Sequence, residues 1–198
     1  MVTTDDLGGA LARARSGDES GFLELWHELQ PRLLRYLRVL ACDSADDVAS
    51  ETWLQVVRDL PRFTGGDKEF RRWLFTIGRH RAIDDARSRK RRPTIPIAET
   101  VADVADDELV EDQVLHALSV RRAIALLAAL PADQAEAVAL RVLAGLDTAA
   151  VAGILDKSPG AVRVALHRGL KTLARNPAVQ ALAGDPARRW TRGRESTR

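Results

Sequence analysis

Apolar residues recur every three or four positions along most of this chain, which is the spacing of one face of an α-helix. In the first half, this periodicity predicts three helices. The second spans about 44–60, after the plausible cap Asp43-Ser44, and the third begins near Lys68 and ends before Pro93. Pro31 lies inside the first helix, which we expect to kink or split there. The apolar residues that mark this first helix are Phe22, Leu25, Trp26, Leu29, Leu33, Leu34 and Leu37.

In the second half, the same periodicity predicts helices near 112–129, 131–144, 148–155 and 159–174. The last two, with a short break between them, have the pattern of a helix-turn-helix. Ser158 suits the N-cap of the final helix and Pro159 suits its first position, where a missing N–H is not needed. Either Asp147 or Thr148 could cap the helix before the turn.

The final helix is predicted to be amphipathic, with an apolar stripe toward the core and a basic face outward. The stripe consists of Val162, Leu166, Leu170 and Leu173, with Gly169 beside it. The outer face carries Gly160, Arg163, Val164, His167, Arg168 and Lys171. A short helix packed under a second helix with a cationic outer face suits entry into the DNA major groove. An ordinary helical hairpin with a solvated basic face would have the same pattern.

These elements predict an all-α fold of two small helical domains joined by a flexible acidic linker, the second domain containing the helix-turn-helix. We expect the first domain at 19–92 and the second at 112–176. The remaining expected segments are a flexible N-terminus at 1–18, the linker at 93–111 and a basic C-terminal tail at 177–198.

The net charge of +2 conceals a polarised chain. Residues 68–92 contain ten Lys or Arg and three acids, whereas residues 98–113 contain seven acids and no Lys or Arg. Such blocks suggest a basic nucleic-acid surface, an acidic linker and a basic tail. On the basic helix, Trp73 and Phe75 are about 200° apart, so at most one of them is central to the core. A solvated basic face with Trp73 buried is the alternative interpretation.

The predicted second helix is acidic on one side, where Asp47 and Glu51 share a face with Ser50 and Leu54. Paired carboxylates could serve acid/base chemistry or a metal, but no histidine lies near them in the sequence. The two remaining interpretations are a solvated face and a docking surface for a basic partner.

Composition disfavours several other classes of protein. The four histidines lack metal-ligand spacing, and the chain has no Gly-rich phosphate loop, no GxSxG and no catalytic cysteine signature. We therefore expect no catalytic residue, no metal and no cofactor. No apolar run approaches about 20 residues, and the N-terminus lacks a signal peptide's pattern. The single cysteine, Cys42, fits a reducing cytoplasm. These features predict a cytoplasmic protein without membrane insertion.

Three stretches in this order resemble the extracytoplasmic-function (ECF) sigma factors, the small two-domain branch of the sigma-70 family of bacterial RNA polymerase sigma factors. SADDVASETWLQVV resembles the polymerase-docking helix of that family. PRFTGGDKEFRRWLFTIGRHRAIDDARSRKRR resembles its −10 promoter segment. LPADQAEAVALRVLAGLDTAAVAGILDKSPGAVRVALHRGLKTL resembles its −35 domain.

The resemblance implies a function and a set of contacts. The chain would bind core RNA polymerase, direct it to promoter DNA at −35 and −10 elements, and promote opening of the duplex. The implied polymerase contacts are Asp47, Ser50, Glu51, Leu54 and Gln55. The implied −10 contacts are Thr64, Lys68, Arg71, Arg72, Trp73, Arg79, His80, Arg81, Asp84 and Arg87. The implied −35 contacts are Ser158, Gly160, Arg163, Val164, His167, Arg168 and Lys171.

Several positions depart from the family's usual residues. Ser50 stands where Gln is usual, and His80 where Asn is frequent, near the flipped −10 base. Asp156 replaces a common Gly at the turn of the helix-turn-helix. Ala150 replaces a common Glu, and on the recognition helix Ala161 and Ala165 replace polar or basic residues. The promoter preference of relatives therefore does not transfer directly to this chain.

Two other functions compete with a sigma factor. A free-standing helix-turn-helix regulator would bind specific DNA without polymerase, and a helical enzyme would use Asp46, Asp47 and Glu51. Relatives of the ECF type are commonly held inactive by an anti-sigma factor, so the resemblance also implies such a partner.

Overall fold

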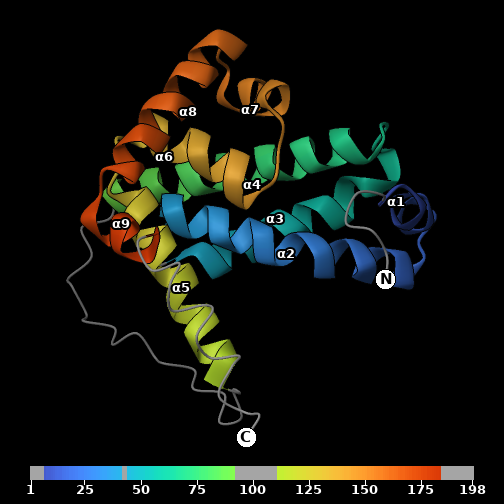
Figure 1. Ribbon diagram of the computed structural model, residues 1–198. Helices are drawn as coiled ribbons and strands as arrows, with labels where there is room; N and C mark the ends of the chain where they lie inside the picture. Colours follow the sequence, from blue (N-terminus) through green and yellow to red (C-terminus); the bar gives the residue numbers. More distant parts are fainter. Residues whose placement is uncertain (1–6, 42–43, 92–110, 184–198) are drawn as a thin grey trace, which may run out of the picture.

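The structure, a computed structural model, describes residues 7–41, 44–91 and 111–183, and every regular element in these ranges is a helix or a helical turn (Figure 1). The N-terminal domain consists of α1 (Gly8–Arg15), α2 (Glu19–Ala41), α3 (Ala45–Asp59), the 3-10 turn η2 (Leu60–Arg62) and α4 (Asp67–Arg91). The C-terminal domain consists of α5 (Glu111–Ala128), α6 (Ala132–Val138), the π-helical turn η3 (Ala139–Leu143), α7 (Thr148–Leu155), α8 (Pro159–Ala174) and α9 (Pro177–Ala183).

The N-terminal domain is built around α2, which packs against α1, α3 and α4. One face of α2 is completely buried, and its residues follow the helical period: Leu25, Leu29, Leu33, Tyr36 and Leu37. Of the two expected effects of Pro31, a kink or a split, the split does not occur, because α2 continues through the proline. Pro31 and His27 are both exposed, so water can satisfy the His27 carbonyl that the proline leaves without an N–H partner.

Helix α1 differs from the expected flexible N-terminus over 1–18. Its apolar side is buried against α2, with Ala10 and Leu11 each 2% exposed. Gly21 permits this approach, because a Cβ there would lie 2.7 Å from the carbonyl oxygen of Ala10. A larger residue at Gly21 would force the two helices apart.

The helix-turn-helix has the predicted bounds and caps. The Asp147 carboxylate accepts a hydrogen bond from the backbone N–H of Ala150 at 2.8 Å, and Ser158 Oγ accepts one from Ala161 at 3.2 Å. Between the helices, Asp156 adopts the left-handed conformation, with φ of 52°. This non-glycine residue therefore makes the turn in a conformation that favours glycine.

The stripe predicted on α8 is only partly buried. Val162 is fully buried, as predicted. Leu170 was also predicted to face the core, but it is 49% exposed, so that prediction was wrong. Gly169 is buried instead, because α6 passes so close that a Cβ would lie 2.8 Å from Val138 Cγ2.

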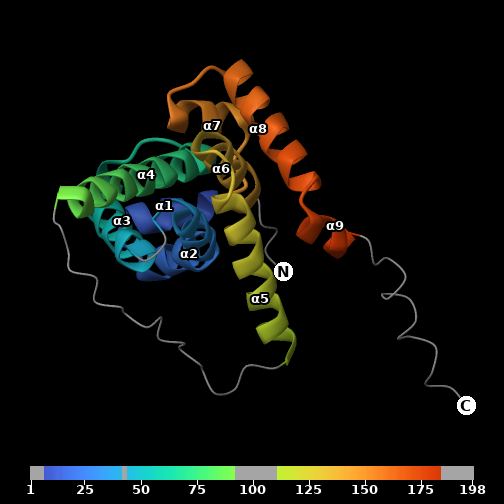
Figure 2. The same ribbon diagram turned by 90° about the vertical axis from the view of Figure 1, so that its left-hand side faces the viewer.

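The two domains pack against each other and share one continuous core. Figure 2 shows α7 beside α4, and α5 crossing the end of α2. The sequence predicted two domains but not this packing. The expected acidic linker, residues 93–111, lies outside the described residues except for Glu111, as does the tail from 184 onward.

Candidate nucleic-acid interface

The outward side of α3 combines acidic side chains with exposed apolar ones. Asp47, Ser50 and Glu51 are exposed as predicted, and Leu54 is 72% exposed beside them. Val57, which the sequence analysis missed, is 52% exposed one turn further along the helix. We call Asp47, Ser50, Glu51, Leu54 and Val57 the α3 face. Apolar side chains this exposed among carboxylates are typical of a protein-binding surface.

Arg81 of α4, an expected DNA contact, interacts with Gln55 and Glu51 of α3, which are expected polymerase contacts. Its Nη2 donates to Gln55 Oε1 at 3.0 Å, and its Nη1 lies 3.8 Å from Glu51 Oε2. The expected polymerase contacts and this expected DNA contact therefore form one cluster across α3 and α4. Ser50 Oγ donates back to the Asp46 carbonyl at 2.9 Å, within its own helix.

The loop before α4 is shaped by two glycines and supported by aromatic rings. Gly65 has φ of +148°, and a Cβ there would lie 2.9 Å from Glu69 Cβ. Gly66 donates its backbone N–H to Glu69 Oε2 at 3.0 Å, which closes the loop onto the helix. Trp73 is half-buried and stacks on Phe63 with ring centroids 4.9 Å apart.

Those contacts leave the polar residues of the loop, Thr64 and Lys68, exposed. They also bear out the prediction that only one of Trp73 and Phe75 is central to the core, because Phe75 is fully buried.

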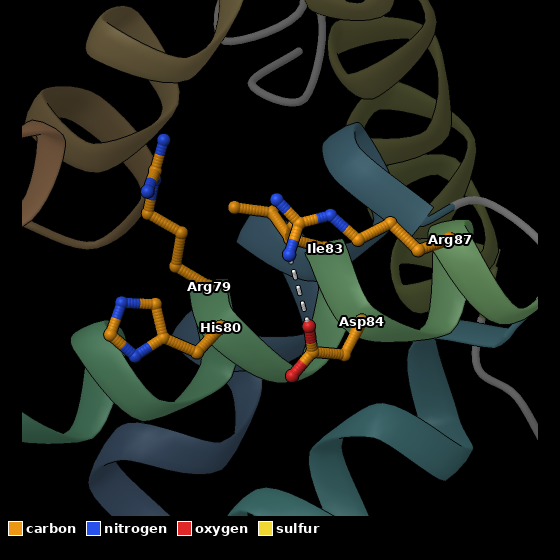
Figure 3. A pocket seen from close by; sticks show the side chains of 5 residues that line it. All are labelled: Arg79, His80, Ile83, Asp84 and Arg87. Carbon is orange, nitrogen blue, oxygen red and sulfur yellow. Dashed lines mark hydrogen bonds and ion pairs between the residues drawn. The ribbon is translucent and has the colours of Figure 1, made fainter.

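A shallow hollow of about 320 Å³ lies on α4 and is lined by Arg79, His80, Ile83, Asp84 and Arg87 (Figure 3). Arg87 folds back so that its Nη1 lies 3.5 Å from Asp84 Oδ1, while the exposed imidazole of His80 lies at the other end. Four of the predicted −10 residues of this helix, Arg79, His80, Asp84 and Arg87, therefore line one hollow. The combination of an imidazole, two guanidinium groups and an apolar side chain suits a base and its phosphate.

Arg71 does not join this surface. It is 8% exposed, and its Nε donates to Asp67 Oδ1 at 3.0 Å on the preceding turn. A buried guanidinium paired with a carboxylate holds the start of α4 in place. By contrast, Arg72 on the next position is exposed.

Arg79 pairs with the C-terminal domain. Its Nε donates to Glu136 Oε1 at 2.7 Å, and the hydroxyl of Tyr36 donates to the same oxygen at 3.1 Å. Burial raises the pKa of Tyr36 well above its usual value, and the Glu136 carboxylate adds to this effect. Partial burial works to lower the pKa of Arg79, but the hydrogen bond and charge of Glu136 outweigh it and raise that pKa. Glu136 was not singled out from the sequence, where nothing marks it as the partner of a residue 57 positions away.

The outward side of α8 is open. Arg163, His167, Arg168 and Lys171 are exposed, and Val164 is 49% exposed among them. We call these five residues the α8 face. Ser158, at the start of the helix, is exposed but uses its hydroxyl as the N-cap, and Gly160 is partly exposed. The α8 face presents cations and one apolar side chain, as a helix in the major groove does.

Two chemical features bear on other classes of site. Among the described residues, no three His, Cys, Asp or Glu side chains lie together as metal ligands. None of the helices in the described ranges has the length and apolar character needed to cross a bilayer. What the described surfaces offer is binding, with cations on α4 and α8 and an apolar–acidic patch on α3.

This all-helical arrangement, with a basic helix in one domain and a helix-turn-helix in the other, defines a DNA-binding protein of two parts. Comparison with known families is more specific. The Sigma-70 region 2 family matches residues 25–92, and the Sigma-70, region 4 family matches residues 121–173. Together they cover more than half of the chain, which belongs to the sigma-70 family and, by its relatives, to the ECF RNA polymerase sigma factors.

The relatives that support this assignment match most of the chain. The ECF sigma factor SigD of Mycobacterium tuberculosis is 35% identical over 174 residues, which are 84% of this chain and 82% of SigD. ShbA of Streptomyces griseus is 34% identical over 180 residues, covering 86% of this chain and 94% of ShbA. BldN of Streptomyces coelicolor is 32% identical over 82% of this chain, which spans only 62% of BldN.

Solved structures share the fold. CnrH in complex with the cytosolic domain of CnrY has a TM-score of 0.60 at 22% identity, over 91% of this chain and 99% of that one. The sigma factor RpoE of Bartonella quintana, in complex with the anti-sigma factor NepR, has a TM-score of 0.58 at 22% identity, over 83% and 98% of the two chains.

Proposed function

We propose that this chain is a promoter-specificity subunit that binds core RNA polymerase, directs it to −35 and −10 elements and helps to open the DNA. In this proposal residues 19–92 act on polymerase and the −10 element, and residues 112–176 act on the −35 element. The chain performs no reaction of its own, because the polymerase supplies the chemistry of RNA synthesis. It works in the cytoplasm, where promoter DNA is found.

The observation that carries the proposal is the occurrence of both sigma-70 regions, in order, with the expected binding side chains exposed on α3 and α8. The α3 face is the proposed polymerase-docking surface. Leu54 and Val57 would be buried by the partner, and Asp47 and Glu51 would pair with basic residues around that apolar centre.

The hollow on α4 is the proposed −10 site. His80 and the half-buried Trp73 offer aromatic faces to an unpaired base, and Arg72, Arg79 and Arg87 offer donors to phosphates. Arg71 is removed from the contacts suggested by the sequence, because its guanidinium serves Asp67. The α8 face is the proposed −35 reader, with Arg163, His167, Arg168 and Lys171 as its polar contacts.

Two further points follow from the relatives. A free-standing helix-turn-helix regulator is not favoured, because the α3 and α4 half of the chain matches a sigma-70 region of its own. RpoE of Bartonella quintana forms a complex with an anti-sigma factor. We propose that this chain also has an anti-sigma partner, which would cover the α3 face or the α8 face.

The test is transcription in vitro with bacterial core polymerase and a pool of promoter fragments, using the wild-type chain and two variants. Leu54→Asp places a charge at the centre of the α3 face and should reduce transcripts and core binding at least tenfold, since the cost of a buried unpaired charge is several kcal/mol. Val142→Asp is the matched control, because Val142 is 57% exposed and lies outside the three surfaces.

We expect the wild-type chain and Val142→Asp to give transcripts that share upstream −35 and −10 sequences. Absence of both core binding and new transcripts with the wild-type chain would refute the proposed function. Equal activity of Leu54→Asp and Val142→Asp would refute the docking surface while leaving the function intact.

A further inference from the structure

The two domains meet at a buried polar group formed by Tyr36 on α2, Arg79 on α4 and Glu136 on α6, which we call the interdomain triad. Glu136 Oε1 accepts from Tyr36 at 3.1 Å and from Arg79 Nε at 2.7 Å, and Arg79 Nη2 donates to Glu136 Oε2 at 3.4 Å. The Glu136 side chain is 13% exposed and Tyr36 is fully buried. A carboxylate this buried depends on these charge-assisted hydrogen bonds. The triad therefore favours the arrangement in which the two domains pack against each other, which we call the closed arrangement.

Apolar and backbone contacts also join the two domains. Val39 of α2 packs against the core that the domains share and against a second cluster formed within the C-terminal domain. Gly153 of α7 lies over α4, where a Cβ would be 3.6 Å from Arg72 Cδ. Gly145 lies over α2, where a Cβ would be 3.1 Å from Arg32 Nη1. The closed arrangement is therefore a packed interface along α2 and α4 (Figure 2).

The closed arrangement uses the donors of Arg79 that a nucleic acid would need. Arg79 presents Nε and Nη2 side by side to the two oxygens of Glu136, which is also the geometry in which a guanidinium holds a phosphate. Arg79 is moreover one of the residues that line the hollow on α4. The same guanidinium edge cannot donate to Glu136 and to a DNA phosphate at once.

The other two surfaces are not affected in the same way. Leu54 of the α3 face is 72% exposed in the closed arrangement, and the basic residues of the α8 face are exposed as well. Only the hollow on α4 has one of its cations held by the opposite domain. The closed form is therefore ready to dock through α3 but not to hold DNA at Arg79.

We propose that Glu136 is an internal competitor of DNA phosphate, so that the free chain keeps its −10 helix partly masked until the domains separate. This inference rests on the proposed function, since it takes Arg79 to be a DNA contact. Separation of the domains releases Arg79 for phosphate and leaves Glu136 to water. Any partner that holds α6 away from α4 increases the affinity of α4 for DNA.

The experiment compares the wild-type full-length chain, Glu136→Gln and Glu24→Gln. Glu136→Gln removes the charge but retains an oxygen that can accept from Tyr36. Glu24→Gln is the matched control, because it removes the same charge from a pair with Arg13 that lies within the N-terminal domain. We measure the radius of gyration by small-angle X-ray scattering, and the affinity for a fluorescein-labelled, mixed-sequence single-stranded 20-mer by anisotropy.

We expect Glu136→Gln to have a larger radius of gyration and to bind the 20-mer about tenfold more tightly than Glu24→Gln, the equivalent of one charged hydrogen bond. Tyr36→Phe, which removes one hydrogen bond and no charge, should shift both quantities in the same direction by a smaller factor. It also keeps the test decisive if Glu136→Gln loses helicity by circular dichroism.

Two outcomes would overturn the inference. If the variants at Glu136 and Tyr36 match Glu24→Gln in both quantities, the triad does not hold the domains together. If they expand the chain without tighter DNA binding, the closed arrangement does not mask α4. Failure of the proposed function is recognised separately, because the wild-type chain would then give no transcription with core polymerase.

Discussion

Helices α4 and α8 are both basic and both proposed to contact DNA, yet their cations are used differently. On α8, the residues Arg163, His167, Arg168 and Lys171 are exposed, and none of the described acids lies within ion-pair distance of them. On α4, five arginines pair with acids: Arg71 with Asp67, Arg79 with Glu136, Arg81 with Glu51, Arg87 with Asp84 and Arg89 with Asp85. Positive charge on a helix therefore does not by itself measure how much of the helix is available to DNA.

The difference arises from how each helix is packed. Helix α4 contacts α3 and α2 on its inner side and α7 of the other domain. Two of its arginines pair with carboxylates of other elements, Glu51 of α3 and Glu136 of α6, and the other three pair with acids of α4 itself. Helix α8 rests on α6 and α7 and leaves its outer side open. Of its stripe, Val162 and Gly169 are buried, whereas Leu170 is 49% exposed. Helix α4 is thus packed between elements of both domains, whereas α8 packs on one side only and leaves its other side exposed.

The largest effect that separates the two helices should come from their apolar sides. Phe75→Ala removes a fully buried ring that packs edge-on against Tyr36 at 5.6 Å, and should lower the free energy of unfolding by about 3–5 kcal/mol. Leu170→Ala should change it by less than about 1 kcal/mol, since half of that side chain is already in water. Urea unfolding followed by circular dichroism measures both. Equal losses would mean that α8 is as much a part of the core as α4.

A second contrast concerns two arginines that the sequence placed in the same functional class. Arg163→Ala on the α8 face should reduce the slope of log affinity against log salt for duplex DNA by about 0.9, without changing the fold. Arg71→Ala should leave that slope unchanged. It should instead lower the free energy of unfolding by about 3 kcal/mol, because Asp67 loses its buried partner.

The measurement is fluorescence anisotropy over a series of NaCl concentrations, accompanied by urea unfolding of each variant. Lys157, which lies in the turn of the helix-turn-helix and pairs with Asp133 at 2.8 Å, supplies a control. Lys157→Ala should change neither quantity by much, because exposed ion pairs contribute little. A reduced salt slope for Arg71→Ala would show that its guanidinium turns to DNA in the complex.

Much of the fold could be predicted from the sequence because the signals are local. The bounds of α7 and α8 follow from Asp147, Ser158 and Pro159, each of which acts within one turn of its own position. Helix α1 could not be predicted in this way. Its burial depends on the close approach at Gly21, and no local pattern distinguishes it from a flexible end.

The candidate site also contains features that local sequence signals predict and features that they do not. Exposure on α8 follows from helical periodicity, so the α8 face was predictable. The pair of Arg71 with Asp67 has i,i+4 spacing and could have been recognised as a structural ion pair. The interdomain triad could not be recognised, because Glu136 is 57 positions from Arg79 and 100 positions from Tyr36. Only the packing of the two domains brings these residues together. Tertiary packing, which a pattern along the chain does not contain, is what pairs Arg79 with Glu136 and Arg81 with Glu51.

Two serines that look alike in the sequence extend this comparison to the smallest effect. Both precede a helix, but Ser158 caps α8, whereas Ser44 donates its Oγ to Asp85 Oδ2 at 2.5 Å and makes no cap. Ser158→Asp should therefore stay within about 0.5 kcal/mol of wild type, since aspartate caps as well as serine. Ser44→Asp should cost about 1 kcal/mol, because it places a carboxylate against Asp85.

Urea unfolding at neutral pH measures both changes. At a pH low enough to protonate the carboxyl groups, the cost at position 44 should shrink. A stable Ser44→Asp at neutral pH would mean that position 44 behaves as an ordinary N-cap, and that the two helix starts are equivalent after all.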